Sequence, residues 1–103
     1  MLVTASNSEE AARLARALVE QRLAACVNMI SGLRSTYWWQ GRVEDADEVL
    51  LVAKTARHLL PAATRLVQSL HSYTIPEILA LPIVDGSAPY LEWLAKEVRA
   101  EAP

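Results

Sequence analysis

The stretch STYWWQGRVE, residues 35–44, places three aromatic side chains side by side in a chain that has no Phe. In an extended strand the side chains alternate, so Tyr37 and Trp39 share one face while Trp38 lies on the other. The glutamine and glycine that follow are typical of a turn, and the stretch ends by starting a returning strand. We therefore predict a β-hairpin whose tip carries amphipathic rings on both faces, as is usual where a surface meets a ligand or a partner.

The segments on either side of this hairpin alternate between strand and helix patterns. A capping box from Ser6 to Glu9 predicts the start of the first helix, and Pro82 restricts the last strand to an edge or an irregular position. We also expect a bulge at residues 31–32 and a polar interruption of the returning strand at residues 45–47. The expected strands cover residues 1–5, 25–39, 42–55 and 78–84, and the expected helices cover residues 6–23, 59–70 and 88–98.

This order, β-α-β-β-α-β with an additional C-terminal helix, matches the α+β ferredoxin-like fold, in which helices cover one face of an antiparallel sheet. The other face of such a sheet normally alternates between apolar and polar residues. Residues 49–53 are instead continuously apolar, so both faces of that strand are expected to be shielded from water. Self-association over the second face is the simplest remedy, which predicts an oligomer.

Composition narrows the class of protein. The 103 residues fit one domain over 1–103. The net charge of −2 and the lack of a basic stripe predict no nucleic-acid partner. The apolar runs are shorter than the roughly 20 residues that span a bilayer, so we expect no membrane insertion. No signal peptide is evident, and the single Cys26 suits a reducing compartment, so we expect a cytoplasmic protein.

Five segments, in order and in register, resemble the CutA family of divalent-cation tolerance proteins. They are AACVN at 24–28, STYWWQG at 35–41, KT at 54–55, HSYTIPEI at 71–78 and YLEWL at 90–94. The resemblance implies a ferredoxin-like subunit, a homotrimer, and architectural kinship with PII signalling proteins, which bind small ligands in clefts between subunits. It also implies a role in tolerance of copper and other divalent cations and in the response to metal ions.

The resemblance suggests one candidate metal ligand. The copper site proposed for a bacterial family member uses a Cys in the first strand and two adjacent His, and these positions correspond to Val3, Leu70 and His71 here. Selective copper or zinc sites bring together three or four nitrogen and sulfur ligands. Of the three positions, only His71 carries a side chain that can bind a metal ion, so binding of copper or another divalent cation at this site depends on His71. The alternative is that His71 interacts with free carbonyls at a helix end.

A second candidate site gathers residues from the same motifs, namely Tyr37, Trp39, Lys54, Tyr73 and Glu77. The resemblance places these motifs around clefts between subunits. A Lys, a Glu and two Tyr can orient an anionic or zwitterionic small molecule against an aromatic wall. The alternative is an ion pair between Lys54 and Glu77 across an interface that the aromatic rings fill.

Catalytic signatures are absent from the sequence. The glycines are isolated, so there is no phosphate-binding loop, and no Ser-His-Asp or Cys-His signature is found. We therefore predict that the protein is not an enzyme. Three functions stay open: a metal-tolerance protein that binds copper, a PII-like sensor of a small molecule, and a structural or partner-binding trimer.

Overall fold

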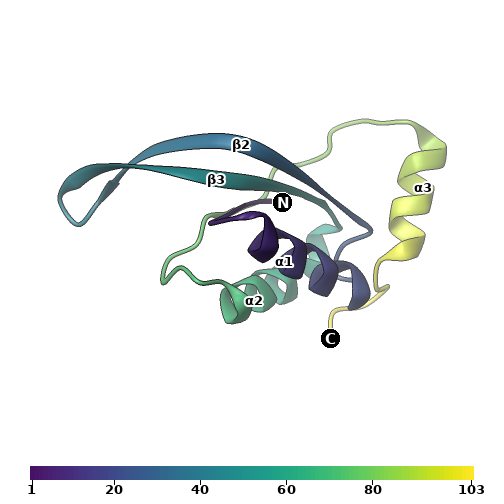
Figure 1. Ribbon diagram of the computed structural model, residues 1–103. Helices are drawn as coiled ribbons and strands as arrows, with labels where there is room; N and C mark the ends of the chain where they lie inside the picture. The colour runs from purple at the N-terminus through teal and green to yellow at the C-terminus, as the bar shows by residue number, and fades with distance from the viewer.

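The computed structural model describes residues 1–103 as a four-stranded antiparallel sheet with helices against one face (Figure 1). The sheet order is β2-β3-β1-β4, which confirms the predicted ferredoxin-like fold. None of the helices has the length and apolar character needed to cross a membrane. The elements are β1 (Leu2–Ala5), α1 (Ser8–Glu20), β2 (Cys26–Trp39), β3 (Arg42–Lys54), a short 3-10 helix (Arg57–Leu59), α2 (Leu60–Leu70), β4 (Ile78–Leu79) and α3 (Ala88–Glu97).

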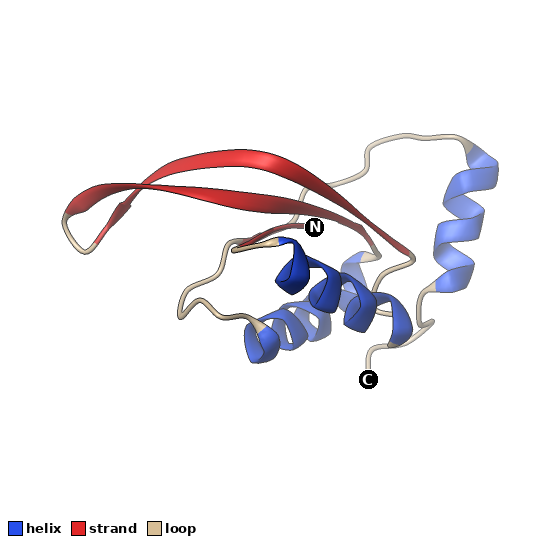
Figure 2. Ribbon diagram, viewed as in Figure 1, coloured by secondary structure: helices blue, strands red, loops and turns tan.

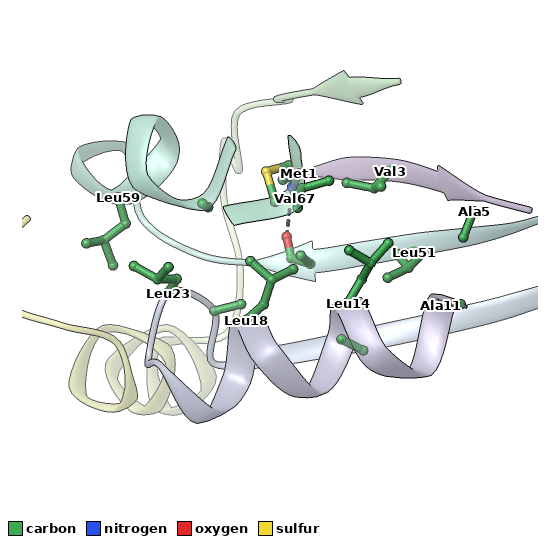
Figure 3. Close-up of a cluster of buried hydrophobic side chains, with 14 of the residues drawn as sticks. Met1, Val3, Ala5, Ala11, Leu14, Leu18, Leu23, Leu51, Leu59 and Val67 are labelled. Carbon is green, nitrogen blue, oxygen red and sulfur yellow. Dashed lines mark hydrogen bonds between the residues drawn. The ribbon is translucent and has the colours of Figure 1, made fainter. Parts of the chain in front are cut away.

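The hydrophobic core lies between the sheet and the layer formed by α1 and α2 (Figure 3). Val3 and Leu51 are paired across β1 and β3 and are fully buried. Burying a side chain of this size stabilises the fold by about 1.5–3 kcal/mol. The Met1 amino group adds a hydrogen bond of 2.7 Å to the carbonyl of Ala53, drawn as a dashed line in Figure 3. The core therefore fixes β1 in the middle of the sheet.

The predicted hairpin is confirmed, and it projects well beyond the helices (Figure 1). Gln40 and Gly41 both have positive φ, 51° and 77°, as the two central residues of a type I′ turn require. The expected bulge is present between Ile30 and Leu33. The expected interruption at 45–47 is wrong, and β3 is continuous.

Cross-strand partners explain why β3 runs through its acidic segment. Thr36 donates a hydrogen bond to Asp45, and Arg34 lies 3.4 Å from the carboxylate of Asp47. Both acidic residues stand directly opposite these partners in the ladder. Opposite polar pairs stabilise a sheet by about 0.2–1 kcal/mol each, which compensates for low strand propensity.

The first helix differs from its predicted bounds at both ends. Asn7 is the N-cap in place of Ser6, and its side chain accepts a hydrogen bond from the Glu10 N–H at 2.8 Å. The helix ends at Glu20, before residue 23, because Arg22 takes a left-handed φ of 55°. The Leu23 N–H then bonds to the Leu18 carbonyl at 2.9 Å, which is the pairing of a Schellman motif.

The last strand is much shorter than predicted, since β4 comprises two residues where we expected 78–84. Its ladder ends where Leu79 pairs with Leu2, the first residue of β1. Beyond that point Pro82 lacks an N–H to donate, and the chain continues without a partner strand to α3 (Figure 2). Ile83 and Val84 on this segment are exposed.

The face of the sheet opposite the helices is uncovered and apolar (Figure 2). Val49, Leu51 and Ala53 point into the core, while alternation places Leu50 and Val52 on the open side. The register adds further apolar neighbours to that side, and Ile30 and Leu79 there are 51% and 54% exposed. We call this surface, defined by Leu2, Ile30, Leu50, Val52 and Leu79, the outer face.

Candidate functional site

A hollow of about 820 Å³ lies between the β2–β3 hairpin and the connection from α2 to β4. Four of the five residues predicted for a cleft line it, namely Tyr37, Trp39, Tyr73 and Glu77. Small-molecule sites typically have volumes of about 300–1,000 Å³, so the hollow has a suitable size. The other lining residues are Thr4, Ser35, Thr36, Trp38, Glu48, Ser72, Thr74, Ile75 and Pro76.

Lys54, the fifth predicted residue, does not line this hollow. It lies at the far end of β3, opposite Cys26. Burial, and then the positive charge of Lys54, lower the pKa of the nearby Met1 amino group. Lys54 is six positions from Glu48 along the strand, which corresponds to about 20 Å. A cleft that joins Lys54 to the other four residues therefore requires a second copy of the chain and stays a prediction.

Tyr73 and Glu48 form the polar centre of the hollow. The Tyr73 hydroxyl donates a hydrogen bond of 2.9 Å to one carboxylate oxygen of Glu48. Burial, and then this hydrogen bond and the negative charge of Glu48, raise the pKa of Tyr73 above its usual range. The phenol therefore remains protonated at physiological pH and holds the carboxylate in place.

Glu10, in the first turn of α1, forms hydrogen bonds that hold the α2–β4 connection, which carries Tyr73, against the start of this helix. Its side chain is buried and accepts hydrogen bonds from the N–H and hydroxyl of Ser6, both at 2.9 Å, and from the N–H of Ser72 at 2.8 Å. Burial alone would raise the pKa of Glu10, but the hydrogen bonds from Ser6 and Ser72 outweigh it and lower the pKa to about 2. This ionised carboxylate positions one wall of the hollow.

His71, the predicted metal ligand, is part of the same buried network. Its Nε2 faces the carbonyl of Thr4 at 2.7 Å, and its Nδ1 faces the N–H of Tyr73 at 3.0 Å. A carbonyl only accepts and an N–H only donates, so Nε2 carries the proton and Nδ1 is the acceptor. Both nitrogens are therefore occupied by backbone groups, and the free helix-end carbonyl expected as the alternative is replaced by one from β1.

The donor set does not fit a metal ion within one chain. The Nδ1 of His71 lies 3.9 Å from the Glu10 carboxylate, but its lone pair is directed to the backbone. Nowhere do three or more His, Cys, Asp or Glu side chains gather in a position to hold a metal ion. Metal coordination by His71 would require the loss of its contact with Thr4 or Tyr73.

Comparison with known proteins places this framework in a family. A family model described as CutA1 divalent ion tolerance protein matches residues 1–97. The chain belongs to the CutA family. This match confirms the resemblance carried by the five sequence motifs.

Curated CutA relatives come from bacteria, plants and animals. The divalent-cation tolerance protein CutA of Thermus thermophilus is 51% identical over 94 residues, which cover 91% of each chain. Protein CutA of Mus musculus is 48% identical over 92 residues, which cover 89% of this chain. The chain spans only 52% of the length of that mouse relative and 55% of a chloroplastic relative from Oryza sativa.

Solved CutA structures have the same fold. The divalent cation tolerance protein from Thermus thermophilus superposes with a TM-score of 0.93 at 49% identity, covering 95% of both chains. CutA1 from Oryza sativa superposes with a TM-score of 0.94 at 45% identity, covering 97% of this chain and 92% of that one. The hairpin and the α2–β4 connection that enclose the hollow therefore belong to a CutA framework.

Proposed function

We propose that this CutA protein acts in divalent-cation tolerance as a homotrimer that binds a small molecule in clefts between its subunits. The observation that carries the proposal is the hollow between the hairpin and the α2–β4 connection, where Tyr37, Trp39, Tyr73 and Glu77 come together. These residues lie on two segments that are far apart in the sequence, β2 and the α2–β4 connection, and the buried contacts of Glu10 hold that connection in place. A surface built in this way suits a ligand better than a purely structural role.

The outer face supports the oligomeric part of the proposal. A large apolar surface on one sheet face is typical of an interface, and closed symmetric assemblies are its usual outcome. Trp38 at the hairpin tip is 74% exposed, which also favours a partner over water. The number of subunits, three, is taken from the family resemblance.

We propose binding rather than catalysis, and a cytoplasmic location. The similar proteins are named for tolerance of divalent cations. The single Cys26 has no partner within the chain for a disulfide. Relatives are named chloroplastic and periplasmic, so location varies within the family.

A thermal-shift screen of metabolites against the tag-free protein tests the proposal. We expect at least one metabolite to raise the unfolding temperature, and we expect Trp39→Ala to abolish that shift because it removes one aromatic wall. Trp93→Ala is the control, since Trp93 is similarly exposed on α3, away from the hollow. A screen without hits, or a hit that both variants retain, would contradict ligand binding in the cleft.

Direct binding of copper at His71, which the family resemblance implied, is the function that we do not expect, although the His71 ring lies 3.9 Å from the Glu10 carboxylate. Because both ring nitrogens are occupied, we expect no saturable binding of one Cu²⁺ per chain at His71. Calorimetric titration of copper into the tag-free protein measures this, with His71→Gln as the comparison. Saturable heat that disappears in His71→Gln would establish copper binding and contradict our expectation.

A further inference from the structure

We propose that His71 is a positioning residue of the proposed cleft, because its imidazole holds Tyr73 where the phenol reaches Glu48. The inference rests on the proposed function in that Tyr73 and Glu48 belong to the candidate site. It gives His71 a role in shaping that site in place of the metal-ligand role offered by the family resemblance. The His71 side chain is fully buried within one chain, so its contacts do not depend on what covers the hairpin.

His71 takes the place of a strand partner at the edge of β1. β4 pairs with only the first two residues of β1, so this edge has no strand beyond Val3. The carbonyl of Met1 is bonded to Ala53 on β3, and the alternation of a strand directs the backbone of Thr4 to the opposite edge. There the Nε2 of His71 donates a hydrogen bond of 2.7 Å to the Thr4 carbonyl. The imidazole therefore supplies the donor that a buried carbonyl needs, and it holds the start of the α2–β4 connection against β1.

The other side of the imidazole fixes Tyr73. Its Nδ1 accepts a hydrogen bond of 3.0 Å from the Tyr73 N–H, and the two ring centroids lie 4.7 Å apart with the planes tilted by 45°. Both the backbone and the ring of Tyr73 are thus held by His71. From this position the Tyr73 hydroxyl reaches the Glu48 carboxylate on β3 at 2.9 Å. His71 and Tyr73 therefore connect the free edge of β1 to a carboxylate of the candidate site.

Only one form of the His71 ring makes both hydrogen bonds, the neutral ring with its proton on Nε2. The Glu10 carboxylate lies 3.9 Å from Nδ1, but it is already bonded to Ser6 and Ser72, and Nδ1 is left to Tyr73. Burial of a polar ring is unfavourable unless its nitrogens are paired, whereas an apolar ring would fill the same space without partners. Packing alone therefore does not account for a His at this position, and the placement of Tyr73 does.

NMR of the protein labelled with ¹³C at the tyrosine Cζ tests the inference, because this carbon responds to the hydrogen bond of the phenol. His71→Phe keeps a buried ring but removes both hydrogen bonds, and Glu48→Ala gives the reference signal of Tyr73 without its acceptor. We expect His71→Phe to move the Tyr73 signal by at least about half of the change that Glu48→Ala produces. His71→Asn restores an acceptor for the N–H two residues further on, as in an Asx-turn, and should recover most of the wild-type signal. The Tyr73 signal is assigned with Tyr73→Phe.

His58→Phe is the matched control, since the Nε2 of the exposed His58 also contacts a backbone carbonyl, that of Arg99 at 2.8 Å. This substitution should leave the Tyr73 signal in place. Unfolding temperature and assembly mass are measured for every variant, so that loss of folding is recognised. Imidazole ¹⁵N spectra of the wild-type protein at about pH 8, where imidazoles are ordinarily neutral, should show the His71 proton on Nε2, and this measurement needs no variant to fold.

A proton on Nδ1 of His71, or a Tyr73 signal that stays in place in folded His71→Phe, would overturn the inference. The two proposals fail separately. An empty metabolite screen together with the expected change of the Tyr73 signal would remove the ligand and keep the role of His71 in placing Tyr73. Metabolite hits without that change would remove the role of His71 alone.

Discussion

Glu10→Gln is expected to lower the free energy of unfolding by about 3 kcal/mol at neutral pH. The pKa of Glu10 falls from an ordinary 4.5 to about 2 in the folded chain, and each unit corresponds to about 1.4 kcal/mol. The Gln side chain has only one acceptor oxygen. Its NH₂ group would therefore face the backbone N–H of Ser6 or of Ser72, each of which donates a hydrogen bond to the carboxylate in the wild-type protein. Urea unfolding at a fixed protein concentration measures the difference.

The same substitution should change the response to acid. The pKa of Glu10 is lower in the folded chain than in the unfolded chain. Its contribution to the free energy of unfolding is therefore complete above pH 4.5 and is lost as the pH falls toward 2. Over that pH interval the free energy of unfolding should therefore fall by about 3 kcal/mol more for the wild-type protein than for Glu10→Gln. Glu9→Gln is the matched control, since Glu9 is the exposed neighbour in the same helical turn. Equal effects of the two substitutions would contradict the role of Glu10 as the fastening residue.

Leu50→Glu is expected to dissociate the assembly into folded single chains. Leu50 lies in the middle of the outer face, beside Thr4 on β1 and Ile30 on β2. In a single chain a Glu at this position would reach water, whereas in an assembly it would be buried without a partner at a cost of several kcal/mol per subunit. Light scattering measures the mass, and circular dichroism shows that the subunit remains folded.

Val19→Glu is the control for this substitution. Val19 is a 39% exposed apolar residue on α1, so the change adds the same charge on the helical side of the molecule. We expect the assembly to survive this change. Retention of the assembly by Leu50→Glu, or its loss in Val19→Glu, would show that the subunits associate through a different surface.

Local patterns in the sequence were sufficient to predict the order of strands and helices and the fold class. Alternation at Tyr37 and Trp39 and the following turn predicted the hairpin, because strand period and turn chemistry are local properties. The C-terminal end of α1 was missed because a non-glycine residue, Arg22, takes the left-handed conformation. The length of β4 was missed because it depends on pairing with Leu2, which is remote in sequence.

The site was predictable in part. Tyr37, Trp39, Tyr73 and Glu77 were found as motif residues, and the structure brings them together. Glu10 was overlooked, although its spacing to Leu14 and Leu18 placed a carboxylate on the apolar stripe of the helix, which is the signal of a buried charge with partners. Glu48 gave no such signal, because its partner Tyr73 lies 25 residues away in the chain.

We expect two further copies of the chain to cover the outer face and the hairpin. Native mass spectrometry of the tag-free protein, repeated over a dilution series, measures the number of copies. We predict a single species with three times the mass of the chain that persists on dilution. A single-chain species throughout the series, or a dimer, would contradict the claim.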